Sequence, residues 1–84
     1  KGYKLYRAFL TMPAAGRATL RFGRVVAAAA ELFANGQPVA TLRDAKGEWQ
    51  VPLAAPAGQK VELRVRLFAG GEAGGISDGV FLEN

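Results

Sequence analysis

The dipeptide Asn35-Gly36 constrains this chain more than any other feature of its sequence, because it lies between two apolar runs of about strand length. Asn-Gly is a strong signal for a β-hairpin, since both residues tolerate the positive φ that a type I′ turn requires. We therefore expect residues 29–34 to form one strand and residues 39–43 to return antiparallel to it. A hairpin at mid-chain also gives the flanking segments strands to pair with.

An α-helix is the alternative for residues 25–33. The run of four alanines and Glu31 have high helix propensity, and Asn35-Gly36 is also typical of a helix C-terminus. Against a helix, no Ser, Thr, Asp or Asn precedes the segment as an N-cap. Arg24 would also place a positive charge at the positive end of the helix dipole. The residues favour the strand and leave the helix open.

Five further segments have the composition of β-strands, and turn or loop signals separate them. The segment 61–67 alternates best, with apolar residues at its odd positions and charged residues between them. Pro52 has no N–H to donate, which places its strand at a sheet edge or makes the strand end there. The expected strands are 4–12, 18–22, 48–53, 61–67 and 79–83, with turns or loops at 13–16, 44–47, 54–59 and 70–75.

This pattern of short strands predicts an all-β fold, an antiparallel β-sandwich or barrel formed by one domain over residues 1–84. The strand 4–12 carries large apolar residues at both odd and even positions, so the pattern leaves its buried face open. Two buried faces, or one face that meets a missing neighbour, would each explain this pattern. Unpaired strand edges would also favour strand donation or a homo-oligomer.

Composition excludes several classes of function. The 84 residues include no cysteine and no histidine, which rules out disulfides, thiolate nucleophiles, Ser-His-Asp catalysis and Cys/His zinc sites. We expect no cofactor and no metal. No stretch approaches the roughly 20 apolar residues of a membrane span. The chain begins with Lys1 rather than Met, which favours a processed product or a piece of a longer protein.

The net charge of +4 is unevenly distributed, because the first 24 residues carry six Lys or Arg side chains and no acid. We interpret most of these as the outward residues of two strands. The alternative is a basic barrel that binds single-stranded nucleic acid, with Tyr3, Tyr6 and Phe22 stacking on bases. We disfavour this alternative.

No catalytic or phosphate-binding motif is recognisable. The glycines of 70–75 follow a strand, but no Gly-Lys-Ser/Thr ending and no helix come after them. The seven Asp and Glu residues lie mostly at turns or outward strand positions, and their spacing places no pair across a cleft as a glycosidase requires. Trp49 has two interpretations. An exposed ring would suit a sugar-stacking platform, whereas the parity that it shares with Val51 and Leu53 favours the core.

The order of the motifs resembles the sugar-binding, galactose-binding-like jelly-roll domain of family 2 glycoside hydrolases of the β-galactosidase and β-glucuronidase kind. The similarity begins at Tyr6-Arg7-Ala8-Phe9 and includes Leu20-Arg21-Phe22 and the Ala30-Glu31…Asn35-Gly36…Val39 hairpin. It continues through 48–53 and 58–65 and ends in Gly74-Gly75-Ile76…Val80-Phe81-Leu82-Glu83. Two positions depart from the family pattern: Ser77 replaces a usual aromatic residue and Ala40 a usual glycine. The strands that usually precede the tyrosine-arginine motif are absent, so the chain resembles the later two-thirds of such a domain or a shortened relative.

The resemblance settles residues 25–34 as strand and implies a non-catalytic, carbohydrate-associated module, with catalysis in a separate barrel domain. The expected partners are a galactoside or polysaccharide, or a glycoside hydrolase catalytic domain. For direct sugar contact we predict Trp49, Tyr6 and Arg43, by aromatic stacking and charge-assisted hydrogen bonds. The alternative is a structural module that packs on a catalytic domain through one apolar patch that includes Tyr3, Leu5 or Phe81.

Overall fold

The computed structural model describes residues 3–68 and the backbone of residues 75–83. It contains five antiparallel strands: β1 (Tyr3–Thr11), β2 (Arg17–Ala34), β3 (Gln37–Ala54), β4 (Lys60–Phe68) and β5 (Gly75–Glu83). The predicted all-β, antiparallel fold class is confirmed. Within these residues no helix is long and apolar enough to cross a membrane. The expected loop 70–75 lies almost wholly outside the described residues.

The β2–β3 hairpin organises the sheet, as the Asn35-Gly36 dipeptide predicts. Asn35 and Gly36 form the two-residue turn, with φ of 50° and 82°, and Ala34 pairs with Gln37 across it. These positive φ values are those that a type I′ turn requires. The side-chain Oδ1 of Asn35 also accepts a hydrogen bond from the backbone N–H of Glu62 at 2.9 Å, which ties the turn to β4.

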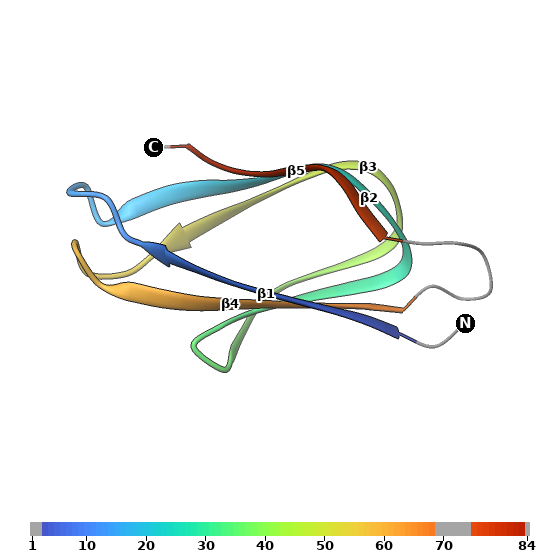
Figure 1. The fold of residues 1–84 in the computed structure, drawn as a ribbon, viewed down its shortest axis with the longest axis horizontal. Coiled ribbons are helices and arrows are strands. Elements are labelled where there is room, and N and C mark those ends of the chain that lie inside the picture. Colours follow the sequence, from blue (N-terminus) through green and yellow to red (C-terminus); the bar gives the residue numbers. More distant parts are fainter. Residues whose placement is uncertain (1–2, 69–74, 84) are drawn as a thin grey trace.

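The helix alternative for residues 25–33 is wrong, because β2 is paired along its length. One edge of β2 pairs with β3, and the other pairs first with β5 (Thr19–Val26) and then with β4 (Ala29–Ala34). Ala27 and Ala30 lie at this change of partner and are buried, where small side chains let the strands bend over the core. Figure 1 shows β2 and β3 curving together from β5 towards the 35–36 turn.

The predicted turn at 44–47 is also wrong, since β3 continues through it as a strand. Asp44 and Gly47 have φ of 53° and 149°, and the β2–β3 register shifts between Phe22 and Val25. Such irregularities bend a strand without ending it, so β3 follows the curve of β2. Pro52 lies in β3, which pairs with β2 alone among the described strands, as the expected edge position requires.

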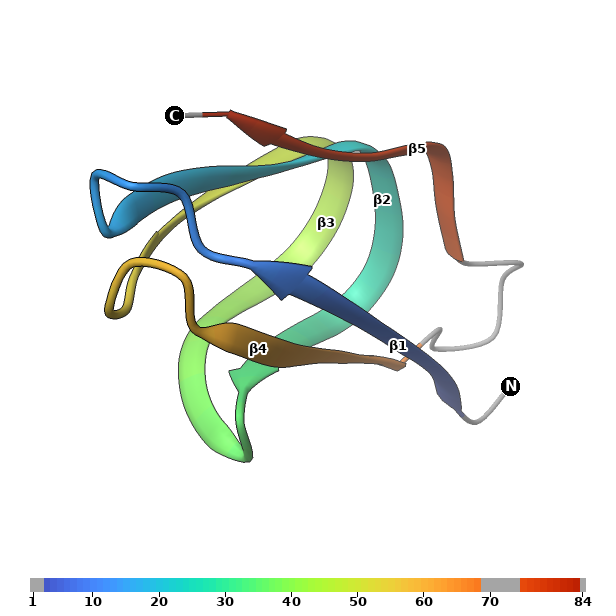
Figure 2. The same cartoon turned by 60° about the vertical axis from the view of Figure 1, so that its left-hand side comes forward.

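The bent sheet folds over one core, as the two faces of a β-sandwich do. Figure 2 shows β1 and β4 lying across the concave side of the β2–β3 ribbon. The alternation predicted for 61–67 is confirmed, because its odd-numbered residues are buried and point at β2 and β3. The core consists of Met12, Ala18, Leu20, Phe22, Val25, Ala27, Ala30, Leu32, Ala45, Trp49, Val51, Leu53, Val61, Leu63, Val65 and Leu67.

Candidate functional site

Trp49 is a core residue, so the structure supports the second of its two interpretations. It lies opposite Phe22 in the β2–β3 register, and the two rings stack with centroids 5.0 Å apart and an interplanar angle of 27°. Only 7% of the residue is exposed. Because sugar stacking requires an accessible ring face, Trp49 cannot serve as a sugar-binding platform in this conformation. The cause is its parity, which it shares with buried Val51 and Leu53.

Tyr6 and Arg43 lie on different sides of the sheet. Tyr6 belongs to the even-numbered side of β1 and packs, half-buried, against the core. Arg43 is exposed on β3 and pairs in register with Ala29 of β2. The structure therefore does not gather Trp49, Tyr6 and Arg43 into one site. Sugar contact by Tyr6 or Arg43 individually stays a prediction.

Among the residues whose side chains are described, most carboxylates accept hydrogen bonds from arginine side chains. Glu31 accepts a hydrogen bond from Arg66 Nε at 2.7 Å, and Glu48 accepts from Arg21. Glu62 is shared, since its Oε2 lies 2.6 Å from Arg7 Nε and 3.1 Å from a terminal nitrogen of Arg64. In the part of the chain with described side chains, no three His, Cys, Asp or Glu side chains gather to hold a metal.

These contacts lower the pKa of two carboxyl groups. Hydrogen bonds from Gln50 and then Arg21 hold the pKa of Glu48 below its ordinary value. For Glu62, partial desolvation raises the pKa, but hydrogen bonds from Arg7 and Arg64 outweigh it and the net pKa is lowered. Both groups are therefore charged near neutral pH, which suits a structural ion pair better than a proton donor.

The most distinctive surface covers the outward side of β1 and β4, where strand parity brings aromatic, aliphatic and basic side chains together. The register pairs Tyr3 with Phe68, Leu5 with Arg66 and Phe9 with Glu62. Leu5 is 75% exposed, Tyr3 65%, Phe9 54% and Phe68 49%. We call this surface the outer face; it comprises Tyr3, Leu5, Arg7 and Phe9 of β1, Lys60, Glu62, Arg64, Arg66 and Phe68 of β4, and Glu31 and Phe33 of β2.

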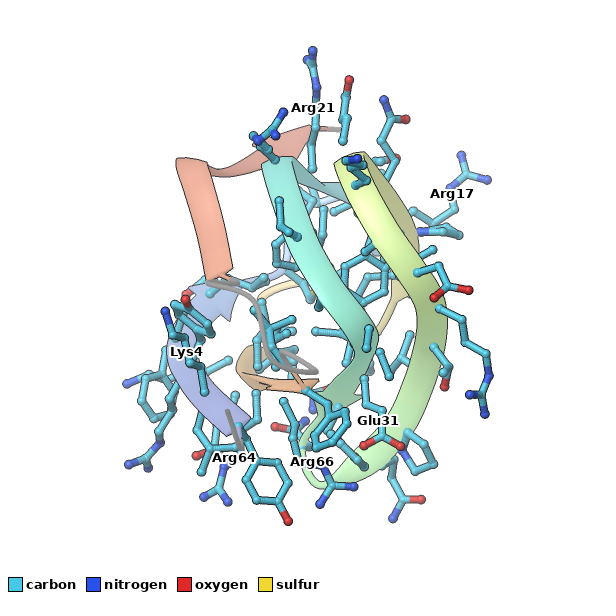
Figure 3. All side chains as sticks on the ribbon, turned by 90° about the vertical axis from the view of Figure 1, so that its right-hand side faces the viewer. Lys4, Arg17, Arg21, Glu31, Arg64 and Arg66 are labelled. Carbon is cyan, nitrogen blue, oxygen red and sulfur yellow. The ribbon has the colours of Figure 1, made fainter. Side chains whose placement is uncertain are left out.

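Contacts between neighbours order the outer face. The rings of Tyr3 and Phe68 meet edge to face with centroids 6.3 Å apart. The Arg7 guanidinium and the Lys60 ammonium lie 5.1 and 5.2 Å from the centroid of Phe9. Figure 3 shows Arg64, Arg66 and Glu31 along the same, lower side of the molecule. With four cations and two carboxylates, the outer face has an excess of positive charge.

A groove of about 530 Å³ opens on the outer face beside the hairpin turn. Its walls combine guanidinium groups with apolar side chains, which is the chemistry of both protein interfaces and anionic-sugar sites. The residues that line it are Leu5, Tyr6, Arg7, Phe33, Gly36, Arg64, Val65 and Arg66.

Sequence reasoning identified this face only in part. The structural-module alternative named Tyr3 and Leu5, which are indeed exposed side by side with Phe68 and Arg66; the side chain of Phe81 lies outside the described residues. The sequence pattern alone did not identify Phe33, Arg64 and Arg66 as residues that line the groove. The signal that could have found them is parity, because the outward positions of 61–67 and the odd positions of 4–12 share one face once the two strands pair.

No protein-family model matches the chain, and no curated protein matches it in sequence. Solved structures do match. A family 2 β-galacturonidase from Eisenbergiella tayi, solved with galacturonate, superposes with a TM-score of 0.79 at 23% identity over the whole of this chain. A family 2 member from Bacteroides cellulosilyticus gives 0.81 at 22% identity over 98% of it. A β-glucuronidase from Faecalibacterium prausnitzii gives 0.67 at 28% identity over 80%.

The chain has the fold of a segment of family 2 glycosidases. It spans 17% of the length of the β-galacturonidase chain, 13% of the Bacteroides chain and 12% of the β-glucuronidase chain. The resemblance read from its motifs is thus confirmed at the level of a family 2-related domain.

Proposed function

We propose that this chain is a non-catalytic, carbohydrate-associated accessory domain of a family 2 type glycoside hydrolase, and that it packs on a neighbouring domain through its outer face. The observation that carries the proposal is the exposure of Tyr3, Leu5, Phe9 and Phe68 on one surface. Large apolar side chains that gather on one exposed surface and are bordered by polar residues are typical of interaction sites. The structural similarity to segments of family 2 glycosidases supports the part of the proposal that assigns the domain to such an enzyme.

The composition of the outer face supports packing on protein over stacking on sugar. Aromatic residues and arginine are the types enriched at protein interfaces and at their energetic centres. Arg7 and Lys60 already lie near the Phe9 ring, and Arg66 lies 5.8 Å from the centroid of Phe33. These rings are therefore partly covered by cations that a stacking sugar would have to displace.

Direct sugar binding in the groove is the second candidate, and the clustering of Arg7, Arg64 and Arg66 there favours it. Guanidinium groups bind carboxylates through paired hydrogen bonds, so the favoured ligand is a uronic acid residue with its ring against Phe33. The solved relatives include a β-glucuronidase and a β-galacturonidase, whose names refer to uronic acid glycosides. A neutral galactoside would make only the weaker hydroxyl contacts.

Saturation-transfer NMR on the isolated chain separates the two candidates. The ligands are glucuronate- and galacturonate-containing oligosaccharides and matched neutral galactosides. The packing proposal predicts no saturation transfer to any of them. Transfer to uronic sugars that Arg64→Gln abolishes, and that the matched control Arg17→Gln preserves, would instead establish the groove as a sugar site. Arg17 is exposed and lies far from Arg64 (Figure 3).

A second assay tests the packing surface itself. The dye 1-anilinonaphthalene-8-sulfonate fluoresces on exposed apolar patches, and we expect it to bind the folded chain. Leu5→Ser with Phe68→Ser should reduce the signal while leaving the unfolding midpoint unchanged. An unchanged dye signal, or a large loss of stability, would show that these side chains do not form a free interaction surface. Steady turnover of an aryl β-glycoside by the pure chain would overturn its non-catalytic character.

A further inference from the structure

The Asn35-Gly36 dipeptide carries a reactive pair of groups in addition to forming the turn. The backbone nitrogen of a glycine is not shielded by a Cβ atom. When asparagine precedes the glycine, this nitrogen can close a five-membered ring on the side-chain carbonyl carbon and displace the amide group. Asparagine is accordingly one of the chemically labile residues of proteins. Asn35 therefore belongs to the sequence context in which deamidation is easiest.

Solvent has access to the turn. Asn35, Gly36, Gln37 and Pro38 are all exposed at the tip of the β2–β3 hairpin (Figure 1). Water and hydroxide, which the reaction needs, can therefore reach both reacting groups. Because burial does not protect Asn35, the conformation of the turn decides whether the reaction proceeds.

The geometry of the folded turn opposes ring closure. The first central residue of a type I′ turn has ψ of about +30°, the mirror image of the type I value. In an L-residue with this ψ, the nitrogen of the next residue lies nearly opposite Cβ across the Cα–C bond. The five-membered ring instead requires that nitrogen and Cβ to lie on the same side. Asn35, with φ of 50°, is held in the unreactive arrangement.

Pairing on both sides of Asn35 fixes this arrangement. Asn35 N–H donates to the backbone oxygen of Glu62 at 2.8 Å, and Glu62 N–H donates to Asn35 Oδ1 at 2.9 Å. On the other side of the turn, Gln37 is paired with Ala34. Rotation about the Cα–C bond of Asn35 swings Gly36 and the start of β3, so it must break one of these pairings. The reactive geometry therefore requires the turn to open.

We propose that Asn35 is a deamidation site under the control of the hairpin: the closed turn protects it, and local opening of the turn allows the reaction. In the open turn the Gly36 nitrogen attacks Cγ of Asn35, the Cγ–Nδ2 bond breaks, and ammonia leaves with the proton of the Gly36 amide. Water then opens the cyclic imide. Its addition at Cγ gives aspartate, and its addition at the main-chain carbonyl carbon gives isoaspartate. The net reaction consumes a water molecule and releases ammonia.

The isoaspartate product is incompatible with the turn as it stands. Its main chain runs through the former side chain and is longer by a CH₂ group, so it cannot keep both the hairpin pairing and the contacts with Glu62. It also adds a carboxylate next to Gly36, which lines the groove together with three arginines. Modification would therefore loosen the contact between the turn and β4 and lower the positive charge around the groove. This inference goes beyond the proposed function and does not depend on it.

Mass spectrometry of the full chain tests the protection. Folded chain, and chain unfolded in guanidinium chloride, are incubated in the same mildly alkaline buffer. The tryptic peptide 25–43 is then analysed for deamidation and, with isoaspartyl methyltransferase, for isoaspartate. We expect reaction at Asn35 that is slower in the folded chain by about tenfold or more, because two hydrogen bonds hold the turn.

Gln37 in the same peptide is the internal control. Pro38 follows it and has no N–H, so ring closure by the next backbone nitrogen is blocked and Gln37 should stay unmodified in both states. Equal rates at Asn35 in folded and unfolded chain would overturn the protection. Absence of reaction at Asn35 in the unfolded chain would overturn its assignment as a modification site.

The dependence of the rate on denaturant tests whether local opening is responsible. Opening of the turn alone exposes little surface, so denaturant well below the unfolding midpoint should change the rate at Asn35 only slightly. A rate that rises in parallel with the equilibrium constant for global unfolding would contradict local opening.

Hydrogen exchange of the Glu62 N–H gives an independent readout of the turn. This N–H is bonded to Asn35 Oδ1, so its protection reports the closed state. The matched control is Asn35→Asp, which carries the same charge as isoaspartate but retains the normal main chain and an acceptor oxygen. We expect protection to be kept in Asn35→Asp and lost in chain that carries isoaspartate. Equal protection in both would refute the proposed effect on the turn.

Discussion

Replacing Asn35 by alanine should destabilise the chain by about 2 kcal/mol, as a loss of two separate contributions. The first is the hydrogen bond from Glu62 N–H to Asn35 Oδ1 at 2.9 Å, since a typical bond contributes about 0.5–1.5 kcal/mol net. The second is conformational. Asn35 has φ of 50°, a region that costs most residues roughly 1–2 kcal/mol but that Asn visits readily.

Two further substitutions separate these contributions. Asn35→Gly keeps the positive φ without strain and loses only the hydrogen bond, so about 1 kcal/mol should be lost. Asn35→Asp keeps both the acceptor and a tolerance for positive φ, and it should be the least harmful of the three.

Urea unfolding followed by Trp49 emission measures each free energy of unfolding. Repeating the measurement at two chain concentrations excludes a contribution from association, which would make stability depend on concentration. Equal losses for alanine and glycine would refute the conformational argument. No loss for either would refute the central role of the turn.

Three other predictions follow from the same structure. Phe22→Ala removes the ring that stacks on Trp49 and should cost about 3–5 kcal/mol in urea unfolding; a cost below 1 kcal/mol would contradict the core assignment. Leu5→Ser should change stability by no more than about 0.5 kcal/mol, because Leu5 is 75% exposed; a larger loss would mean that it supports the fold. Glu48 and Glu62 have lowered pKa values in the folded chain, so the unfolded state binds more protons as the pH falls below about 4.5. The free energy of unfolding should therefore fall over that range, and Glu48→Gln with Glu62→Gln should flatten the profile; an unchanged profile would refute the assignment.

Local signals were sufficient for the hairpin and for β4. The Asn35-Gly36 dipeptide favours its own turn geometry. The buried face of 61–67 could be assigned because only one of its two faces is apolar. The six motifs of the resemblance, read in order, also led to the family 2-related fold.

Structural features that depend on strands distant in the sequence could not be predicted from short sequence motifs. Asp44 to Gly47 has the composition of a turn, but β2 supplies pairing partners across it and the strand bends instead of reversing. The four alanines favour a helix locally, and pairing on both edges of β2 overrides that propensity. The two apolar faces of β1 could not be assigned, because that assignment depends on which face meets β2 and β3.

Trp49 fluorescence distinguishes a tryptophan held in the core, away from any ligand on the outer face, from a tryptophan that lies in a sugar-binding face. Emission is recorded with and without iodide, and during titration with galactose-containing and uronic acid oligosaccharides. Because Trp49 is buried, we expect blue-shifted emission that iodide does not quench and that sugars do not change. A red-shifted, quenchable signal that shifts to the blue with sugar would place Trp49 in a binding face and contradict its assignment to the core.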